Sequence, residues 1–370
     1  MKKIWIIFFV FLFLPGAVIS ADFSESSAVF DMDLAQYALQ IAEMCYSPSM
    51  QEAVLAVGGY HRVGCYNMTR TEDDTRHVAA YSVYDRVNED GRTEVIIAVR
   101  GTGKGEWVLN MDLMPSGDYD LSYAENFALA AEDILMTHAD YLDSLNDPLF
   151  LVTGHSRGAA VSNVLGARLT DRFGSENVFA YTFATPGTVR GEYPEYDNIF
   201  NVINPADLVT YLPFPQWGFE RYGIDLVLPV ENGSLAEAAR EAYALRADQT
   251  GAFGDVGSDT AAVQSLVQAM TALSPDVRSG YTIRHALSHP GEAADGEDSM
   301  TAGEVMLMIF DGRLMSRGSD PDLIRRLTAS QNDFTPLLTA LRSFGGSLIT
   351  GMHMPAVYGA WLTAMAQNMP

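Results

Sequence analysis

Apolar residues follow two alternating patterns along the first 215 residues of the chain. Short apolar or alternating runs, typical of β-strands, are separated by stretches in which apolar residues recur at helical spacing. The patterns predict strands at 78–84, 94–100, 148–152, 178–183 and 199–203, and helices at 32–44, at 122–142 and from residue 159 onward. Strands that alternate with helices indicate an α/β fold, in which helices flank a mostly parallel sheet.

The pattern changes after residue 216. Strand-like runs mostly disappear between 217 and 348, and helix-forming residues dominate, with one strongly apolar segment at 306–310. We expect this part to be a large helical insertion that lies over the sheet as a cap or lid; a separate helical domain is the alternative. The apolar segment is equally typical of a buried core helix. The core of the fold is therefore assigned to 22–216 and 349–370.

Residues 1–21 have the order of a secretory signal peptide. Two lysines precede an apolar run at 4–14, a Pro-Gly pair follows, and small residues stand at the expected cleavage position near Ser20 and Ala21. The apolar run is too short to span a bilayer comfortably, and an uncleaved anchor is the alternative. We expect the protein to be exported and extracellular.

Charge and cysteine content narrow the range of partners. The formal net charge of −24 repels nucleic acid, so a nucleic-acid partner is not expected. The sequence lacks the common calcium and zinc motifs, and we expect neither a metal nor a cofactor. Cys45 and Cys65 predict one disulfide in an exported chain, with two free thiols as the alternative. No pattern indicates an oligomeric state.

The clearest chemical motif is G-H-S-R-G at 154–158, which lies between a predicted strand and a predicted helix. A turn this sharp brings backbone segments together, and Gly154 and Gly158 remove the side chains that would clash. Ser156 would then stand exposed and strained at the end of the sheet, which is the geometry of a nucleophile elbow. An ordinary glycine-rich turn is the alternative. An activated serine also needs a base, an acid that orients the base, and donors for an oxyanion.

Asp207 is the candidate acid. It follows the strand predicted at 199–203, after Asn204-Pro205, and chemistry in parallel sheets gathers at the carboxyl ends of strands. A carboxylate there can orient an imidazole and stabilise its protonated form. An aspartate that only caps the following turn is the alternative.

Three histidines follow Asp207, as the chain order of elbow hydrolases requires for the base. His285 and His289 lie in a polar part of the insertion, whereas His353 lies on a short loop before a helix that Pro355 is suited to begin. A short loop before a helix suits a general base. We therefore favour His353, with His289 as the second candidate.

Two groups are candidate oxyanion donors. One is the backbone N–H of Arg157, at the start of the helix that follows Ser156. The other is Thr102, in the glycine-rich loop G-T-G-K-G that begins at Gly101 after a predicted strand. A phosphate-binding loop is the competing interpretation, but the required G-x-x-x-x-G-K-[ST] pattern is absent.

Taken together, these motifs resemble the class 3 lipase family. The sequences VRGT, TGHSRGAAVSNVLGARL, YTFATPG and NPADLVTYLP and a late H-x-P-x-x-Y occur in the family's order, over about 75–215 and 349–365. The resemblance implies an α/β-hydrolase fold that acts on carboxylic esters of lipids and makes transient contact with lipid interfaces. It implies Ser156 as nucleophile, Asp207 as acid, His353 as base and Thr102 as oxyanion donor.

The chain departs from the family pattern at two points. Arg157 replaces the small or apolar residue that usually follows the nucleophile, and the segment between Asp207 and His353 is much longer than usual. The sequence therefore predicts a secreted serine hydrolase of carboxylic, acylglycerol-type esters that works through an acyl-enzyme. A secreted binding module without turnover, and a peptidase or thioesterase, are the alternatives.

Overall fold

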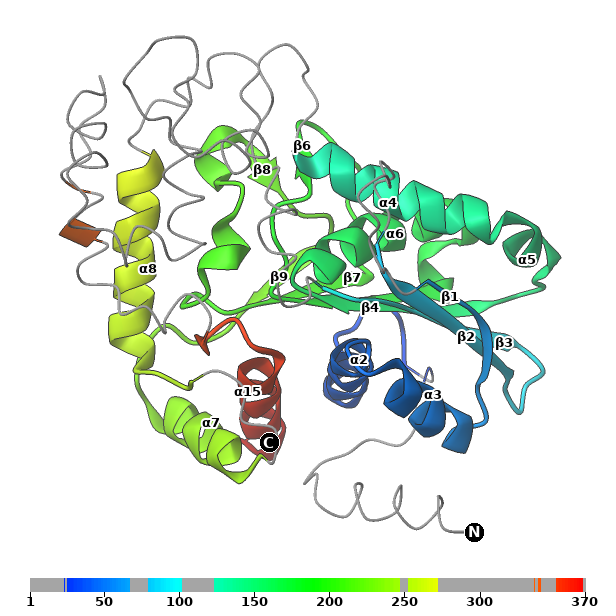
Figure 1. Cartoon of the computed structure of the whole chain (residues 1–370), viewed down its shortest axis with the longest axis horizontal. Coiled ribbons are helices and arrows are strands. Elements are labelled where there is room, and N and C mark those ends of the chain that lie inside the picture. The colour runs from blue at the N-terminus through cyan, green and yellow to red at the C-terminus, as the bar shows by residue number, and fades with distance from the viewer. Residues whose placement is uncertain are drawn as a thin grey trace, which may run out of the picture.

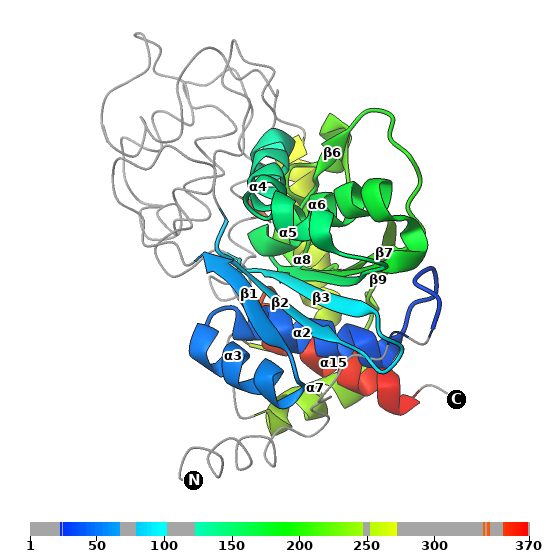
Figure 2. The ribbon, with the colours of Figure 1, turned by 90° about the vertical axis from the view of Figure 1, so that its right-hand side faces the viewer.

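The computed structural model describes residues 23, 25–66, 79–101, 123–246, 252–271, 336, 339–340 and 351–368. The predicted signal peptide at 1–21 and the apolar segment at 306–310 lie outside these residues. Within them, the chain forms a sheet covered by helices on both faces (Figures 1 and 2).

The main sheet has seven strands in the order β1-β2-β3-β4-β5-β7-β9. The first two neighbouring pairs are antiparallel, and the pairs from β3 to β9 are parallel, which confirms the predicted α/β class with a mostly parallel sheet. The strands are β1 (His61–Tyr66), β2 (Tyr81–Val87), β3 (Thr93–Val99), β4 (Leu149–His155), β5 (Val178–Phe183), β7 (Ile199–Ile203) and β9 (Ile224–Val227). A separate two-stranded ribbon pairs β6 (Val189–Arg190) with β8 (Phe219–Glu220).

Helices cover the two faces of the sheet in different groups. One face carries α4 (Tyr123–Thr137), α5 (Ala139–Ser144) and α6 (Arg157–Phe173), and the other carries α2 (Met32–Met44), α3 (Pro48–Val57), α7 (Ser234–Leu245) and α15 (Pro355–Asn368) (Figure 2). The one helix expected at 122–142 is two helices, because the backbone of His138 is not helical. No helix in the described ranges has the length and apolar character needed to cross a membrane. Three short 3₁₀-helices connect these elements: η1 (Ser175–Asn177), η2 (Leu208–Tyr211) and η3 (Pro215–Trp217).

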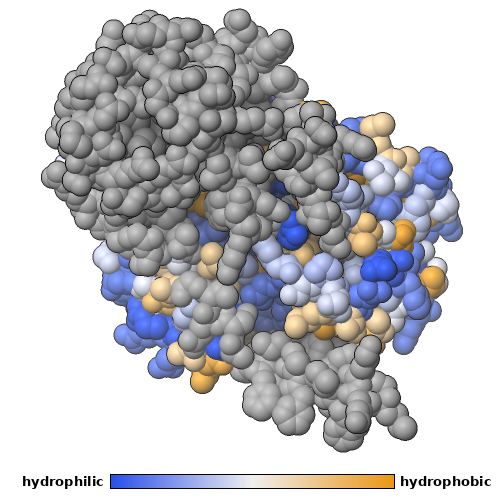
Figure 3. All heavy atoms as spheres, viewed as in Figure 1, coloured by the Kyte–Doolittle hydropathy of each residue, from blue (hydrophilic) through white to orange (hydrophobic). Residues whose placement is uncertain are grey.

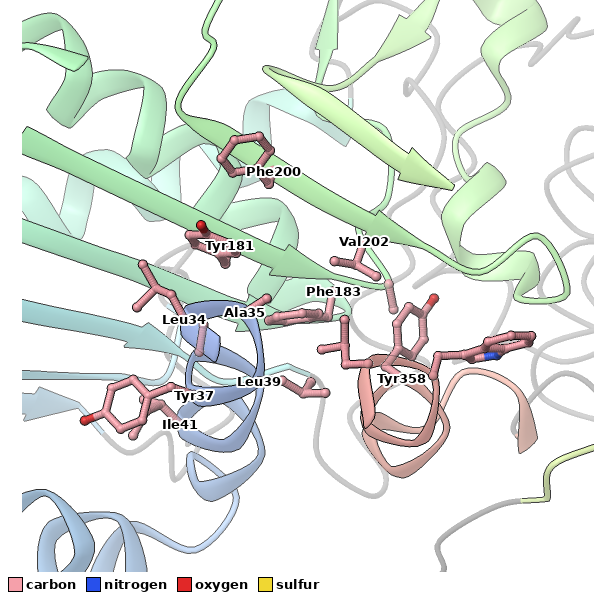
Figure 4. Packing of buried hydrophobic residues seen from close by; sticks show 14 of the residues in the cluster. Leu34, Ala35, Tyr37, Leu39, Ile41, Tyr181, Phe183, Phe200, Val202 and Tyr358 are labelled. Carbon is pink, nitrogen blue, oxygen red and sulfur yellow. The ribbon is translucent and has the colours of Figure 1, made fainter. Parts of the chain in front are cut away.

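Strand β4 shows why the central strands appear as unbroken apolar runs. All seven of its residues are buried. Phe150 and Val152 belong to the core on the α6 face, and Leu149 and Leu151 belong to the core on the α2 face. A parallel strand covered on both faces has no polar side, so its sequence does not alternate. Figure 4 shows the core on the α2 face, where α2 and α15 pack side by side against the strands.

The sheet continues beyond residue 216, where the sequence pattern placed the end of the core. β9 pairs in parallel with β7, and α7 packs on α15 through Ala236, Ala239 and Tyr243 of the same apolar core. The pattern missed β9 because this edge strand has four residues, most of them exposed, and carries Asp225. The beginning of the predicted insertion is thus built into the core.

Helix α8 (Val256–Thr271) contributes to both cores, with Val256 in the core on the α2 face. Its Val263, Leu266 and Val267 join the core cluster that also contains Leu208 and Leu212, next to Asp207. Residues 272–335 lie outside the described part, and the role of the predicted insertion as a cap stays a prediction.

The predicted disulfide is wrong, because both cysteines are free thiols. Cys45 is buried after α2, where the Gln51 amide donates to its sulfur at 3.2 Å, whereas Cys65 is exposed on the edge strand β1. Burial raises the pKa of the Cys45 thiol to about 12. Spacing in the sequence could not reveal this difference in environment.

The described surface mixes polar and apolar residues. Figure 3 shows hydrophilic residues interspersed with small groups of hydrophobic ones on that face. Single exposed apolar residues, such as Val227 and Leu245, are common on folded proteins and need no special function.

Candidate active site

Ser156 lies at the apex of a sharp turn between β4 and α6. Its φ of 60° and ψ of −131° place a non-glycine residue at positive φ, a conformation that costs free energy and recurs at functional sites. The predicted strand, turn and helix are all present around it. The backbone thus has the geometry of a nucleophile elbow.

Three glycines make this turn possible. A Cβ at Gly154 would overlap the carbonyl group of Gly158, and a Cβ at Gly158 would overlap the Val99 carbonyl oxygen at the end of β3. A Cβ at Gly101 would lie 2.6 Å from the His155 carbonyl oxygen and 3.3 Å from the Ser156 Cβ. The ends of β3 and β4 therefore approach the nucleophile elbow more closely than side chains would allow.

The structure brings Ser156, His353 and Asp207 together. The Ser156 Oγ lies 2.8 Å from His353 Nε2, and His353 Nδ1 lies 2.8 Å from Asp207 Oδ2. A carboxylate only accepts hydrogen bonds, so the neutral imidazole carries its proton on Nδ1. Nε2 is then free of a proton and accepts the bond from the Ser156 hydroxyl.

All three side chains are buried. Ser156 is 4% exposed, and His353 and Asp207 are each 1% exposed. The serine was expected to stand exposed at the end of the sheet, but the loop that carries His353 lies against its hydroxyl. Low local polarity strengthens the hydrogen bonds between the three side chains.

Asp207 has the hydrogen bonds of both interpretations that the sequence left as alternatives. Its Oδ1 accepts the backbone N–H of Val209 at 2.9 Å and so caps η2. Its Oδ2 faces His353. One carboxylate oxygen therefore caps η2, and the other accepts the hydrogen bond from His353.

Tyr358 is a residue of the site that the sequence analysis did not assign. Its hydroxyl donates to Asp207 Oδ2 at 2.8 Å and accepts from the Asn204 N–H at 3.3 Å. Burial raises the pKa of Tyr358 well above its ordinary value, so the hydroxyl remains a donor. The sequence did contain a signal for this residue. Tyr358 lies one turn after Pro355, the first residue of α15, on the helix that follows the His353 loop.

We expect Tyr358→Phe to lower kcat for ester hydrolysis roughly tenfold with little change in KM, because Asp207 Oδ2 would lose one of its two hydrogen-bond donors. Steady-state kinetics and thermal unfolding measure the effect. Tyr181→Phe is the matched control, since that buried hydroxyl accepts a bond from the Asp31 N–H and should leave kcat unchanged. Full kcat in the Tyr358 variant would show that Asp207 needs no support from this hydroxyl.

The loop that carries His353 is held by neighbours on two sides. Asn204, at the end of β7, donates its amide to the Met352 carbonyl oxygen at 3.1 Å. The backbone N–H of Gly254, in the segment between α7 and α8, lies 3.4 Å from the Met352 sulfur. The predicted insertion thus contributes directly to the support of this loop.

The candidate oxyanion donors are only partly described. Arg157 is the first residue of α6, so its backbone N–H lies at the amino end of the helix beside Ser156. Thr102 lies outside the described residues, but the preceding Gly101 is buried against Ser156. The assignment of Thr102 as an oxyanion donor therefore stays a prediction.

The two other candidate bases are not tested by the described part of the chain. His285 and His289 lie outside the described residues, so His289 stays the second candidate. Within the described ranges, no three His, Cys, Asp or Glu side chains gather into a candidate metal site.

Comparison with known families agrees with the site. Residues 96–217, which run from β3 through the nucleophile elbow and Asp207, match the model described as lipase (class 3). This third of the chain, which holds the elbow and Asp207, is similar to the class 3 lipase family. The similarity lies in the region where the motifs predicted it.

Similar solved structures come from fungal lipases. They include a Rhizomucor miehei lipase propeptide complex (16% identity, 53% of this chain, 66% of that chain, TM-score 0.42) and the lipase from Rhizopus microsporus var. chinensis (18%, 53%, 73%, 0.41). A third is lipase II from Rhizopus niveus (16%, 53%, 80%, 0.41). The match spans slightly less than two thirds of the Rhizomucor miehei chain.

Proposed function

We propose that the protein is a secreted serine hydrolase of the α/β-hydrolase fold that cleaves carboxylic esters of lipids through an acyl-enzyme. The observation that carries the proposal is the unbroken chain of hydrogen bonds from Ser156 Oγ through His353 to Asp207, each 2.8 Å long. This arrangement can take a proton from the hydroxyl and keep the resulting imidazolium beside a carboxylate.

Acylation uses this proton path. His353 Nε2 takes the proton of Ser156 as Oγ attacks the ester carbonyl carbon, and the carbonyl oxygen becomes an oxyanion. The backbone N–H of Arg157 and a donor group of Thr102, its N–H or its hydroxyl, would stabilise this negative charge by hydrogen bonds. The intermediate collapses by breaking the bond to the alcohol oxygen, which takes the proton from His353 and leaves as the alcohol.

Deacylation repeats the same steps with water. His353 takes a proton from water as the water oxygen attacks the acyl-enzyme. Breaking the bond to Ser156 Oγ, with return of the proton from His353, releases the carboxylic acid and restores the serine. Asp207 stabilises the imidazolium in both halves and remains ionised.

The similarity of residues 96–217 to class 3 lipases supports lipid esters as the proposed substrates. Export is proposed from the N-terminal sequence at 1–21, and a cap function from the insertion at 217–348. A lipid substrate would also bring the enzyme into transient contact with lipid interfaces.

Two assays test the proposal. Purified protein should release p-nitrophenol from esters of increasing acyl length and fatty acid from triacylglycerol emulsions, and it should act less well on matched thioester and peptide substrates. A fluorophosphonate probe should label the protein, with the adduct mapped to Ser156 by mass spectrometry. Absence of both turnover and labelling would favour a binding module, and a preference for peptides or thioesters would overturn the ester assignment.

A further inference from the structure

His155, the residue directly before the nucleophile, has no part in the steps above, yet it is buried at 3% exposure within the site. Its Nε2 lies 2.7 Å from the backbone carbonyl oxygen of His353. We propose that His155 is a positioning residue, which fixes the loop of the catalytic base to the strand of the nucleophile. This inference rests on the proposed hydrolase function.

The acceptor determines the tautomer of His155. A carbonyl oxygen can only accept a hydrogen bond, so His155 Nε2 must carry the proton. Nδ1 then holds the lone pair, and it is buried without a hydrogen-bond partner in the described structure. The His155 side chain therefore makes one hydrogen bond, which its Nε2–H donates to the loop of His353.

His155 remains neutral while His353 changes charge. Burial, followed by the charge on His353, lowers the pKa of His155 well below its ordinary value. The two rings lie 4.8 Å apart between centroids, at 45°. A second proton on His155 would place two cations in contact, so the donor is preserved when His353 becomes imidazolium.

The elbow contacts residue 353 twice. His155 bonds the backbone carbonyl of residue 353, and Ser156 Oγ bonds its side chain. The elbow itself is fixed, because His155 is paired with Phe183 of β5 and the Ser156 N–H donates to the Phe183 carbonyl oxygen at 3.0 Å. The paired end of β4 therefore contacts both the backbone and the imidazole of residue 353.

Two successive carbonyls of the base loop are anchored in this way. Asn204, directly after the strand that leads to the acid, donates to the carbonyl of Met352, and His155, at the end of the strand that leads to the nucleophile, donates to the carbonyl of His353. The loop is therefore tied separately to the supports of both of its partners. A displacement on the order of 1 Å in such a site can cost about a hundredfold in rate, so these ties matter for turnover.

Two substitutions distinguish the effect of the His155 N–H donor from the effect of its buried ring. His155→Phe keeps a buried ring and removes the donor, whereas His155→Gln retains an N–H donor at similar reach. We expect kcat to fall roughly 10- to 100-fold in His155→Phe with KM within about twofold, and to recover to within about threefold of the parent in His155→Gln. The rate of fluorophosphonate labelling at Ser156 should follow kcat.

His138→Phe is the matched control. His138 also has a buried Nε2 without a described partner, but it packs on Tyr81 away from the three site residues, so kcat should be unchanged. Thermal unfolding of all three variants reports any general loss of stability. Undiminished kcat in His155→Phe, or an equal loss in His155→Gln, would overturn the proposal.

A second measurement does not depend on turnover. In ¹⁵N-histidine NMR spectra of the Ser156→Ala protein, His155 should appear as the neutral tautomer protonated on Nε2. A proton on Nδ1 instead would overturn the proposal. Absence of ester hydrolysis by the parent protein would refute the proposed function, while this spectrum would still test the contact.

Discussion

Ser156→Ala is expected to lower kcat for ester hydrolysis on the order of a million-fold, because it removes the hydroxyl that lies 2.8 Å from His353 Nε2 and would attack the ester carbonyl. The residual rate would come from substrate binding and the oxyanion donors. Since alanine is smaller and retains the backbone at this turn, the variant should still fold. Rates with p-nitrophenyl esters and circular dichroism spectra measure both effects.

Ser162→Ala provides the matched control. Ser162 lies on α6, the helix that begins after Ser156, is fully buried, and donates its hydroxyl to the Thr153 carbonyl oxygen at 2.8 Å. Its loss should reduce the free energy of unfolding by about 1 kcal/mol and leave kcat nearly unchanged. If Ser156→Ala retained activity, or if the two variants lost it equally, Ser156 would not be the nucleophile.

The residues of the site could be chosen from the sequence because each has a local signal. Gly154 and Gly158 mark a turn that only side-chain-free backbone can make, and Asn204-Pro205 ends the strand before Asp207. Parallel strands then bring their carboxyl ends to one edge, so residues distant in the chain become neighbours. His353 could be favoured for another reason: it follows Asp207 in the chain and lies on a short loop before the helix that Pro355 begins.

What the sequence could not provide depends on packing between distant elements. The support that Tyr358 gives to Asp207 requires the angle at which α15 meets the sheet, which no periodicity encodes. The donor role of His155 likewise appears only when the His353 loop is in place.

The short edge strand β9 and the free thiols were missed for related reasons. A four-residue strand with one charged position has too little apolar signal to be distinguished from a loop. Close spacing of Cys45 and Cys65 does not reveal that one thiol is buried after α2 and the other is exposed on β1. The roles of Thr102 and of the insertion remain predictions, because the residues concerned lie outside the described part of the chain.

Asp207→Asn is expected to lower kcat on the order of ten-thousand-fold, although the new side chain has almost the same shape. The reason is the number of donors that surround the carboxylate. Val209 N–H points at Oδ1, and His353 Nδ1 and the Tyr358 hydroxyl point at Oδ2. A carboxylate accepts from all three, whereas an asparagine has only one oxygen.

Neither orientation of the amide satisfies these donors. With the NH₂ group facing His353, the imidazole must move its proton from Nδ1 to Nε2 and can no longer accept the proton of Ser156. With the NH₂ group facing Val209, two donors meet at the start of η2 and the cap is lost. We therefore expect the free energy of unfolding to fall by about 2 kcal/mol as well.

Asp31→Asn separates the catalytic effect from the loss of a carboxylate cap. Asp31 Oδ1 accepts the Leu34 N–H at 2.7 Å at the start of α2, and it faces no imidazole. Asparagine caps helices about as well as aspartate, so both kcat and stability should remain close to those of the parent. Rates at saturating substrate and urea unfolding curves measure the comparison. An Asp207→Asn protein that kept more than about a tenth of the parent kcat would mean that the tautomer of His353 is held by something other than this carboxylate.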